Sequence, residues 1–277
     1  MKSSSYQQTT RLEVDDENSE EEDIIEIEET YDDYVPCKVQ LGCKHPDLIV
    51  QSISLASIDP PDVWYKLSLP EEIINSEALS DLQLEAIIYS CQLHERILPD
   101  GSRAGFLIGD GPGVGKGRTL AGVIFENYLQ GRKKSIWISA SSDLTYDVVR
   151  DLRDVGAKHI AVHALNKMYE DISAGVHGLI KEGVVFSIYS TLSDKSGQKR
   201  HLVEWCGKDF DGVIVFDECP RDGNTCEAVV QLQNELPKAR IIYTSVNGAS
   251  NPRKMGCMIR LGLWGQGTAF KGCIIMM

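Results

Sequence analysis

The sequence lacks paired cysteines. Its eight cysteines include no CxxC spacing and no partner histidine at a metal-ligand spacing. The sequence therefore predicts neither a zinc site nor the disulfide framework of a small secreted domain. It also lacks an apolar run near the roughly 18 residues of a membrane-spanning helix, and its N-terminus is polar, unlike a signal peptide. We therefore expect no membrane partner and a reducing compartment, cytosolic or nuclear.

Basic residues are missing from one N-terminal segment. Residues 13–33 contain 13 of the 41 acidic residues and no Lys or Arg, so the remaining 28 acids balance the 28 bases and the net charge of -13 belongs to this segment. A block of like charge repels itself and buries little apolar surface, which predicts a disordered acidic tail over residues 1–34. The tail is interpreted either as solubilising or, because Ile24, Ile25 and Ile27 alternate with acids, as an interaction segment.

The rest of the chain divides into three parts. A length of 277 residues with 42% hydrophobic content predicts one sizeable core. Residues 35–77 are mixed and interrupted by prolines, which predicts a lead-in segment on the surface, and we assign it no chemistry. Residues 78–250 form the predicted domain, which opens with a helix capped at Ser80 and Asp81, and residues 251–277 form a C-terminal stub.

Short apolar runs alternate with helical stretches through the predicted domain. The apolar runs are residues 105–108, 135–139, 160–163, 184–188, 213–216 and 240–244, and the helical stretches are residues 117–129, 144–155, 200–206 and 226–236. Continuous Val/Ile runs between helices predict an α/β fold with a mostly parallel sheet covered on both faces. Ligands of such sheets bind at the carboxyl ends of the strands.

A glycine-rich segment follows the first apolar run. Residues 109–119 read GDGPGVGKGRT and lead into a predicted helix. Backbone N–H groups of such a loop can surround a phosphate, the helix N-terminus adds positive charge, and Lys116 can reach the β- and γ-phosphates of ATP. The predicted ATP-binding residues are Gly111, Gly113, Gly115, Lys116, Gly117, Arg118 and Thr119.

Two positions depart from the usual phosphate loop. Asp110 stands at the first glycine, and Gly117 stands where a Ser or Thr hydroxyl would contact Mg²⁺. Thr119 lies two residues further along, on another side of the helix, so it is a poor substitute. The alternative interpretation is a glycine-rich turn that only connects a strand to a helix.

A second constellation is the apolar run 213–216, which ends in Asp217 and Glu218. Asp217 is predicted to hold Mg²⁺, and Glu218 is the predicted catalytic residue, which orients or deprotonates the attacking water. On its own, a strand that ends in two acids is more often a surface turn. Its position 101 residues after Lys116 favours a nucleotide-hydrolysis motif.

Together these motifs are helicase superfamily 2 signatures, and the sequence resembles the strawberry notch family of helicase-like transcriptional co-regulators over residues 31–267. The most specific stretches are residues 60–65 (PPDVWY), 103–111 (RAGFLIGDG), 113–119 (GVGKGRT), 205–207 (WCG) and 209–219 (DFDGVIVFDEC). The resemblance implies a RecA-like P-loop domain, nuclear localisation and a role in chromatin and transcription. It also implies that the absent Ser or Thr at Gly117 is a family trait.

Other family features match in part. The resemblance implies that Gln83 reads adenine, with a surface glutamine as the alternative, and that residues 139–141 and 189–191 touch a nucleic-acid backbone. Where the family has Asp-Glu-Cys-His and Ser-Ala-Thr, this chain has Pro220 as the fourth residue and Ser245-Val246-Asn247. The last seven residues, 271–277, do not resemble the family.

We therefore expect the ATP-binding, RecA-like domain of a nuclear chromatin or transcription co-regulator, ending before a second such domain and without unwinding activity. The alternatives are a working DNA-stimulated ATPase and a nucleotide-insensitive scaffold that acts through the acidic tail. DNA or RNA as a partner has weak support, because the basic clusters 132–134 and 199–201 are short and such clusters are usually solvated faces.

Overall fold

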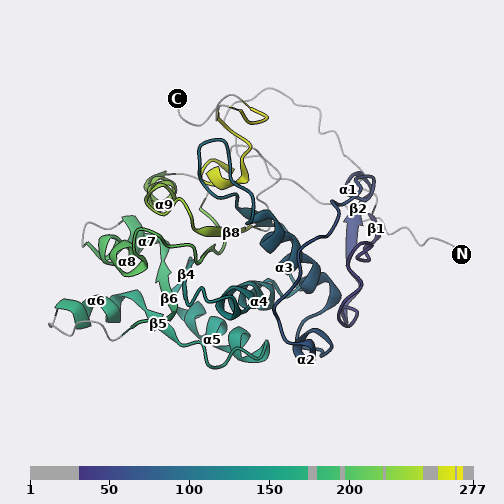
Figure 1. The fold of residues 1–277 in the computed structure, drawn as a ribbon, viewed down its shortest axis with the longest axis horizontal. Coiled ribbons are helices and arrows are strands. Elements are labelled where there is room, and N and C mark those ends of the chain that lie inside the picture. Colours follow the sequence, from purple (N-terminus) through teal and green to yellow (C-terminus); the bar gives the residue numbers. More distant parts are fainter. Residues whose placement is uncertain are drawn as a thin grey trace, which may run out of the picture.

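A six-stranded parallel sheet lies at the centre of the computed structural model (Figure 1). The structure describes residues 31–173, 180–193, 197–220, 223–245, 255–265 and 267–270. In spatial order the strands are β3 (Phe106–Ile108), β8 (Arg240–Thr244), β7 (Val213–Phe216), β4 (Lys134–Ser139), β6 (Gly183–Ile188) and β5 (Val162–Ala164). All five pairings are parallel, which confirms the predicted α/β, RecA-like architecture.

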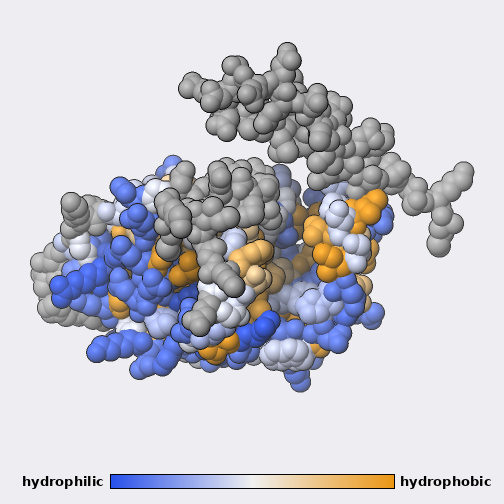
Figure 2. All heavy atoms as spheres, turned by 90° about the horizontal axis from the view of Figure 1, so that it is seen from above, coloured by the Kyte–Doolittle hydropathy of each residue, from blue (hydrophilic) through white to orange (hydrophobic). Residues whose placement is uncertain are grey.

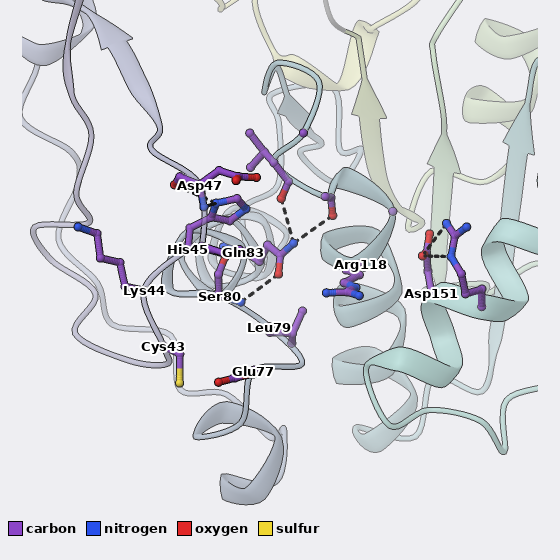
Figure 3. A pocket seen from close by; sticks show the side chains of 16 residues that line it. Cys43, Lys44, His45, Asp47, Glu77, Leu79, Ser80, Gln83, Arg118 and Asp151 are labelled. Carbon is purple, nitrogen blue, oxygen red and sulfur yellow. Dashed lines mark hydrogen bonds and ion pairs between the residues drawn. The ribbon is translucent and has the colours of Figure 1, made fainter.

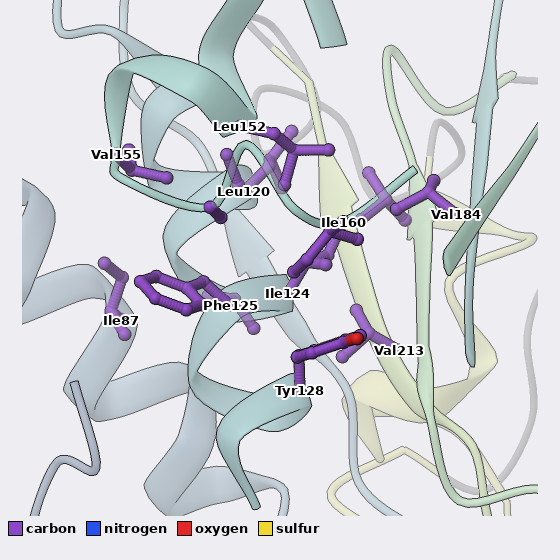
Figure 4. Close-up of a cluster of buried hydrophobic side chains, with 14 of the residues drawn as sticks. Ile87, Leu120, Ile124, Phe125, Tyr128, Leu152, Val155, Ile160, Val184 and Val213 are labelled. Atoms are coloured by element: carbon purple, nitrogen blue, oxygen red, sulfur yellow. The ribbon is translucent and has the colours of Figure 1, made fainter. Parts of the chain in front are cut away.

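Helices cover both faces of the sheet. One face packs against α3 (Asp81–Leu93), α4 (Lys116–Leu129) and α5 (Thr145–Asp154). The other packs against α6 (Leu165–Ser173), α7 (Tyr189–Ser193), α8 (Gln198–Cys206) and α9 (Gly223–Glu235). Side chains of a strand alternate between the faces, so Val213 and Val215 join the first core, part of which Figure 4 shows, and Ile214 and Phe216 join the second.

The predicted helices and strands are confirmed to within a few residues, and β7 and β8 match the predicted ranges. Helix α3 begins where Ser80 predicted: the Ser80 side chain accepts from the backbone N–H of Gln83, and the Gln83 side chain accepts from the backbone N–H of Ser80. Two helices were missed, α6 and α7. They are short, with nine and five residues, so few positions are available to show a helical pattern.

The lead-in segment contains short elements and is anchored to the helices. Its elements are β1 (Tyr31–Asp33), β2 (Val50–Ser52), α1 (Ile53–Ala56) and α2 (Glu71–Ile74), with β1 and β2 antiparallel. The buried carboxylate of Glu126 in α4 accepts from the backbone N–H groups of Ser68 and Leu69 at 2.9 Å and from the hydroxyl of Tyr65 at 2.9 Å. The segment is therefore held to the domain through backbone groups, which side-chain patterns do not reveal.

The two ends of the chain are only partly described. Residues 1–30 of the predicted tail lie outside the described residues, and β1 is formed by Tyr31–Asp33, which the prediction included in that tail. Of the predicted stub, Cys257, Met258 and Arg260 are buried, and Arg260 donates to the backbone carbonyls of Arg103 and Pro237. A short 3-10 helix, η4 (Ile259–Leu261), holds this arginine in place.

An apolar patch lies over β1, β2 and α1 (Figure 2). Its exposed side chains are those of Val35, Leu48, Val50, Ile53, Leu55 and Ile58. Among the described helices, none is both long enough and apolar enough to cross a membrane.

Candidate functional site

The glycine-rich loop forms an open cradle between β3 and α4. Gly113 and Gly115 have φ values of 96° and 82°, which side chains other than glycine rarely adopt. A Cβ atom built on Gly109, Gly111 or Gly113 would meet no heavy atom within 4 Å, so the space in front of these residues is open. Within the described residues no side chain caps the N-terminus of α4. Its first N–H groups are therefore available to an anion.

Lys116 is the first residue of α4 and points back into the loop. Its Nζ donates to the backbone carbonyl of Asp110 at 3.0 Å and to that of Gly111 at 3.3 Å. The ammonium thus lies within the cradle. When a phosphate binds there, its oxygens would replace these carbonyls as the acceptors of the ammonium. Burial raises the pKa of the neighbouring Asp110 carboxyl, and the charge of Lys116 opposes that shift.

Gln83 contacts the phosphate loop from the side of α3. Its Nε2 donates to the carbonyls of Val114 at 2.9 Å and Gly115 at 3.2 Å, while its Oε1 accepts from the N–H of Ser80 (Figure 3). The predicted adenine-reading residue therefore lies at the predicted loop, but its amide is bonded to protein on both atoms. In this arrangement Gln83 positions the loop.

The first turn of α4 differs from the usual phosphate loop. A Cβ atom on Gly117 would lie 2.0 Å from Oδ2 of Asp151 in α5, so only glycine fits beside that carboxylate. Arg118 lies at the surface and pairs with Asp154 at 3.5 Å. Thr119 is fully buried, and its Oγ1 has no hydrogen-bond partner in the described part of the chain. Any contact of Thr119 with a phosphate has to use its backbone.

Asp217 and Glu218 follow β7 at the carboxyl edge of the sheet. Asp217 accepts from Ser139 Oγ at 2.9 Å through Oδ2 and from Thr244 Oγ1 at 2.8 Å through Oδ1. The hydroxyl of Tyr189 donates to the carbonyl of Asp217 at 2.9 Å. Glu218 is exposed and has φ 50°, the only positive φ of a described non-glycine residue. Backbone strain of this kind, of order 1–3 kcal/mol, concentrates at functional sites.

The residues predicted to touch nucleic acid divide into two groups. Ser139 and Tyr189 face inward and hold Asp217, whereas Ser141 and Ser190 are exposed at the ends of β4 and β6. Pro220 has no N–H group, and its carbonyl accepts from Cys257 Sγ at 2.8 Å. Val246 and Asn247 lie outside the described residues.

The residues at the site fit a nucleotide-bound Mg²⁺ and not a metal held by protein alone. In the described ranges, no three His, Cys, Asp or Glu side chains come together as a metal cluster. Mg²⁺ bound with a nucleotide takes only one or two carboxylates and completes its shell with phosphates and water. Asp217, fixed by two hydroxyl donors at the sheet edge, is suited to that role.

A cavity of about 670 Å³ opens beside the phosphate loop. It is lined by the lead-in residues 43–47, by Glu77 and Gln83, by the start of α4, and by Arg150 and Asp151 of α5 (Figure 3). Its size lies within the range of about 300–1,000 Å³ that small-molecule sites occupy. The contribution of the lead-in and of α5 could not be predicted from sequence patterns, because their residues lie far from the loop along the chain.

Comparisons with known proteins identify the family of this chain. The family described as "P-loop containing NTP hydrolase pore-1" matches residues 44–277. Protein strawberry notch of Drosophila melanogaster is 55% identical, with 91% of this chain and 17% of that protein covered. Protein strawberry notch homolog 1 of Homo sapiens is 53% identical, covering 98% of this chain and 21% of that protein, and Protein FORGETTER 1 of Arabidopsis thaliana is 50% identical, covering 87% and 20%. The chain thus spans about a fifth of the length of these relatives.

Among solved structures, the Sulfolobus solfataricus SWI2/SNF2 ATPase core in complex with dsDNA is similar, with a TM-score of 0.49 and 18% identity over 67% of this chain and 36% of that chain. The family match covers most of the chain, and the identity of 50% or more to these relatives extends over 87% to 98% of it. The chain belongs to the P-loop containing NTP hydrolase pore-1 family and, within it, to the strawberry notch proteins.

Proposed function

We propose that this domain binds ATP together with Mg²⁺. The family is one of P-loop NTP hydrolases, so nucleotide binding is expected of its members. The observation that carries the proposal is the position of Lys116, whose ammonium lies within an open glycine loop at the uncapped start of α4. The triphosphate would lie on the loop, and the nucleoside would enter the adjoining cavity.

Asp217 would hold the cation at the edge of the sheet, and Glu218 would orient water toward the phosphate. Mg²⁺ supplies charge neutralisation of the phosphates when bound. Ser139 and Thr244 keep the Asp217 carboxylate in one orientation, because each donates to a different oxygen. Tyr189 fixes the backbone of the same residue.

We further propose that the polypeptide of residues 1–277, assayed by itself, hydrolyses ATP slowly and does not unwind duplexes. Phosphoryl transfer depends on positioning and charge stabilisation, and an arginine supplied across a cleft contributes roughly 10³–10⁵ in rate. Helicases of this class place that arginine on a second RecA-like domain, whereas the described residues contain one six-stranded parallel sheet beside the β1–β2 pair. Pro220, at the fourth position of the acidic motif, also favours slow hydrolysis, because it has no N–H to donate.

Steady-state ATP turnover tests this proposal. We expect background rates with and without single-stranded DNA or RNA, and equal rates for the wild type and the Glu218→Gln variant. Nucleic-acid-stimulated turnover that the Glu218→Gln variant loses would contradict it and would favour a working DNA-stimulated ATPase. The DNA and RNA arms also test contact at Ser141 and Ser190, the exposed hydroxyls at the carboxyl ends of β4 and β6.

The basic clusters do not support a nucleic-acid surface. Arg132 pairs with Asp211 at 3.2 Å, and Arg200 pairs with Glu204 at 2.9 Å. Lys134 donates to the backbone carbonyl of Trp205 and lies at the first residue of β4, at the opposite end of the strand from Ser139. Each of these three basic side chains has a partner within the protein.

We also propose a nuclear protein that acts in transcription or chromatin regulation. This proposal rests on the similarity to the strawberry notch proteins, and the apolar patch of residues 35–58 is a surface feature that suits protein interaction. A fluorescent fusion of the chain should concentrate in nuclei. A cytoplasmic distribution would contradict the proposal.

ATP binding is a separate test. Binding too weak to measure would favour the nucleotide-insensitive scaffold.

A further inference from the structure

We propose that Asp151 of α5 supplies the oxygen ligand for the nucleotide-bound Mg²⁺ that Gly117 cannot supply. The inference rests on the proposed ATP binding and adds a metal ligand to that site. In the usual phosphate loop the residue after the lysine is Ser or Thr, whose hydroxyl contacts Mg²⁺. Here that residue is Gly117, which has no side chain.

The position of the Asp151 carboxylate supports this replacement. Oδ2 of Asp151 lies 2.0 Å from the point where a Cβ atom of residue 117 would be, and Cγ lies 3.0 Å from it. A serine hydroxyl oxygen is bonded to Cβ and would therefore lie only slightly closer to that point. The carboxylate oxygen thus lies where a side chain on residue 117 would begin, and it comes from a different helix.

The two oxygens of Asp151 have different surroundings. Oδ1 accepts from Nε of Arg150 at 3.3 Å and from its Nη2 at 3.2 Å. No hydrogen bond reaches Oδ2 from any described residue, although Asp151 is only 8% exposed. Arg150 is itself held by Asp147 at 2.6 Å, so the guanidinium fixes one carboxylate oxygen and leaves the other directed at Gly117.

Asp151 also lines the cavity beside the phosphate loop. Gly115, Gly117 and Arg118 line the same cavity from the start of α4, and Figure 3 shows Gln83 and Asp151 approaching that start from opposite sides. The side chain that carries the unbonded oxygen therefore lines the cavity next to the first residues of α4.

The charge of Asp151 determines which ligand fits. A carboxylate beside a bound triphosphate brings two anions together, which opposes binding of the free nucleotide. A divalent cation between them removes that repulsion, and Mg²⁺ prefers oxygen ligands such as carboxylates and phosphates. We therefore expect this domain to bind Mg²⁺–ATP and to discriminate strongly against ATP without the metal.

The test measures how strongly Mg²⁺ and ATP binding are coupled. A fluorescent ATP analogue is titrated into the whole chain in Mg²⁺ and in EDTA, and the ratio of the two dissociation constants is compared between variants. Asp151→Asn should reduce the ratio roughly tenfold or more, the scale on which metal-site residues act. Asp143→Asn, which removes an exposed acid that precedes α5 and does not contact Arg150, should leave the ratio unchanged. Thermal unfolding shows that each variant is folded.

A second pair of variants moves the ligand back to the loop. Gly117→Ser alone should weaken binding, because its Cβ would clash with Asp151 Oδ2. Combined with Asp151→Ala it should restore the wild-type ratio, whereas Asp151→Ala alone should not. An unchanged ratio in Asp151→Asn, or no gain from the combined variant over Asp151→Ala, overturns the inference while ATP binding stands. If the wild type binds no ATP in either condition, the proposed function falls with it.

Discussion

Thr244 and Asp217 lie side by side at the carboxyl ends of β8 and β7. Thr244 Oγ1 donates a hydrogen bond to Asp217 Oδ1 at 2.8 Å. The same hydroxyl accepts from the backbone N–H of Glu218 at 2.9 Å. One fully buried side chain therefore fixes the carboxylate of one predicted site residue and the strained backbone of the next. The sheet orders the acidic motif through a strand that the sequence motifs did not single out.

Replacing Thr244 by Val should destabilise the domain by about 1–3 kcal/mol, because two partly buried polar groups lose their partner while the volume is kept. Ser139→Ala removes a single hydrogen bond to Asp217 and should cost about 1 kcal/mol. Urea unfolding at one pH gives both values. Equal stability of the Thr244→Val variant and the wild type would show that this hydroxyl does not hold the motif.

Gln83 should act on the phosphate loop and not on the choice of base. Gln83→Ala removes the donors to Val114 and Gly115, so we expect ATP and GTP to lose affinity by similar factors, several-fold each. Gln83→Glu should weaken both further, because it turns an acceptor toward two carbonyls. A loss confined to ATP would instead identify Gln83 as an adenine-reading residue.

Glu85 should give stability a pH dependence of known sign. Burial raises the pKa of its carboxyl above the ordinary 4.5, while the hydrogen bond from Tyr34 opposes that shift. The folded state therefore holds this proton more tightly than the unfolded state. The resulting stability is present below the ordinary pKa and is lost as pH rises through the raised value.

Glu85→Gln removes this charge. Relative to the wild type, its thermal midpoint should rise as the pH increases from 4 toward neutrality, the direction that follows from the raised pKa. Glu72→Gln, the same substitution at an exposed position in α2, serves as the matched control. A midpoint difference that falls with increasing pH would contradict the assignment.

Two N-terminal deletions should differ in effect. Removal of residues 1–30 should leave the thermal midpoint nearly unchanged, because an acidic, self-repelling segment buries little apolar surface. Removal of residues 1–34 also removes β1 and the Tyr34 hydroxyl bonded to Glu85, so it should lower the midpoint further. Calorimetry on both chains checks this order, and equal midpoints would show that β1 adds no stability.

Local patterns predicted most of the sheet. Apolar runs such as residues 213–216 and 240–244 match strands because burial on both faces demands continuous Val and Ile. The Ser80 cap predicted the start of α3 because capping depends on residues three positions apart. The family could also be identified from sequence, since long stretches of residues carry it.

Contacts between distant residues could not be predicted. Gln83 bonds to residues 31 and 32 positions away, Glu126 holds backbone groups 57 and 58 positions away, and Asp151 meets Gly117 from another helix. Each depends on how helices pack, which periodicity leaves open. The substitution at Gly117 was visible as a departure from the phosphate loop, but only the packing of α5 against α4 shows which carboxylate lies beside it.

ATP binding by the wild type and by Lys116→Ala tests the central claim most directly. The titration uses labelled ATP with Mg²⁺, and Lys208→Ala, at an exposed position after α8, is the matched control. We predict measurable binding for the wild type and the control and loss of binding for Lys116→Ala, because the loop N–H groups alone neutralise the phosphates only in part. Equal affinity of all three proteins would contradict the assignment of residues 109–119 as a phosphate loop.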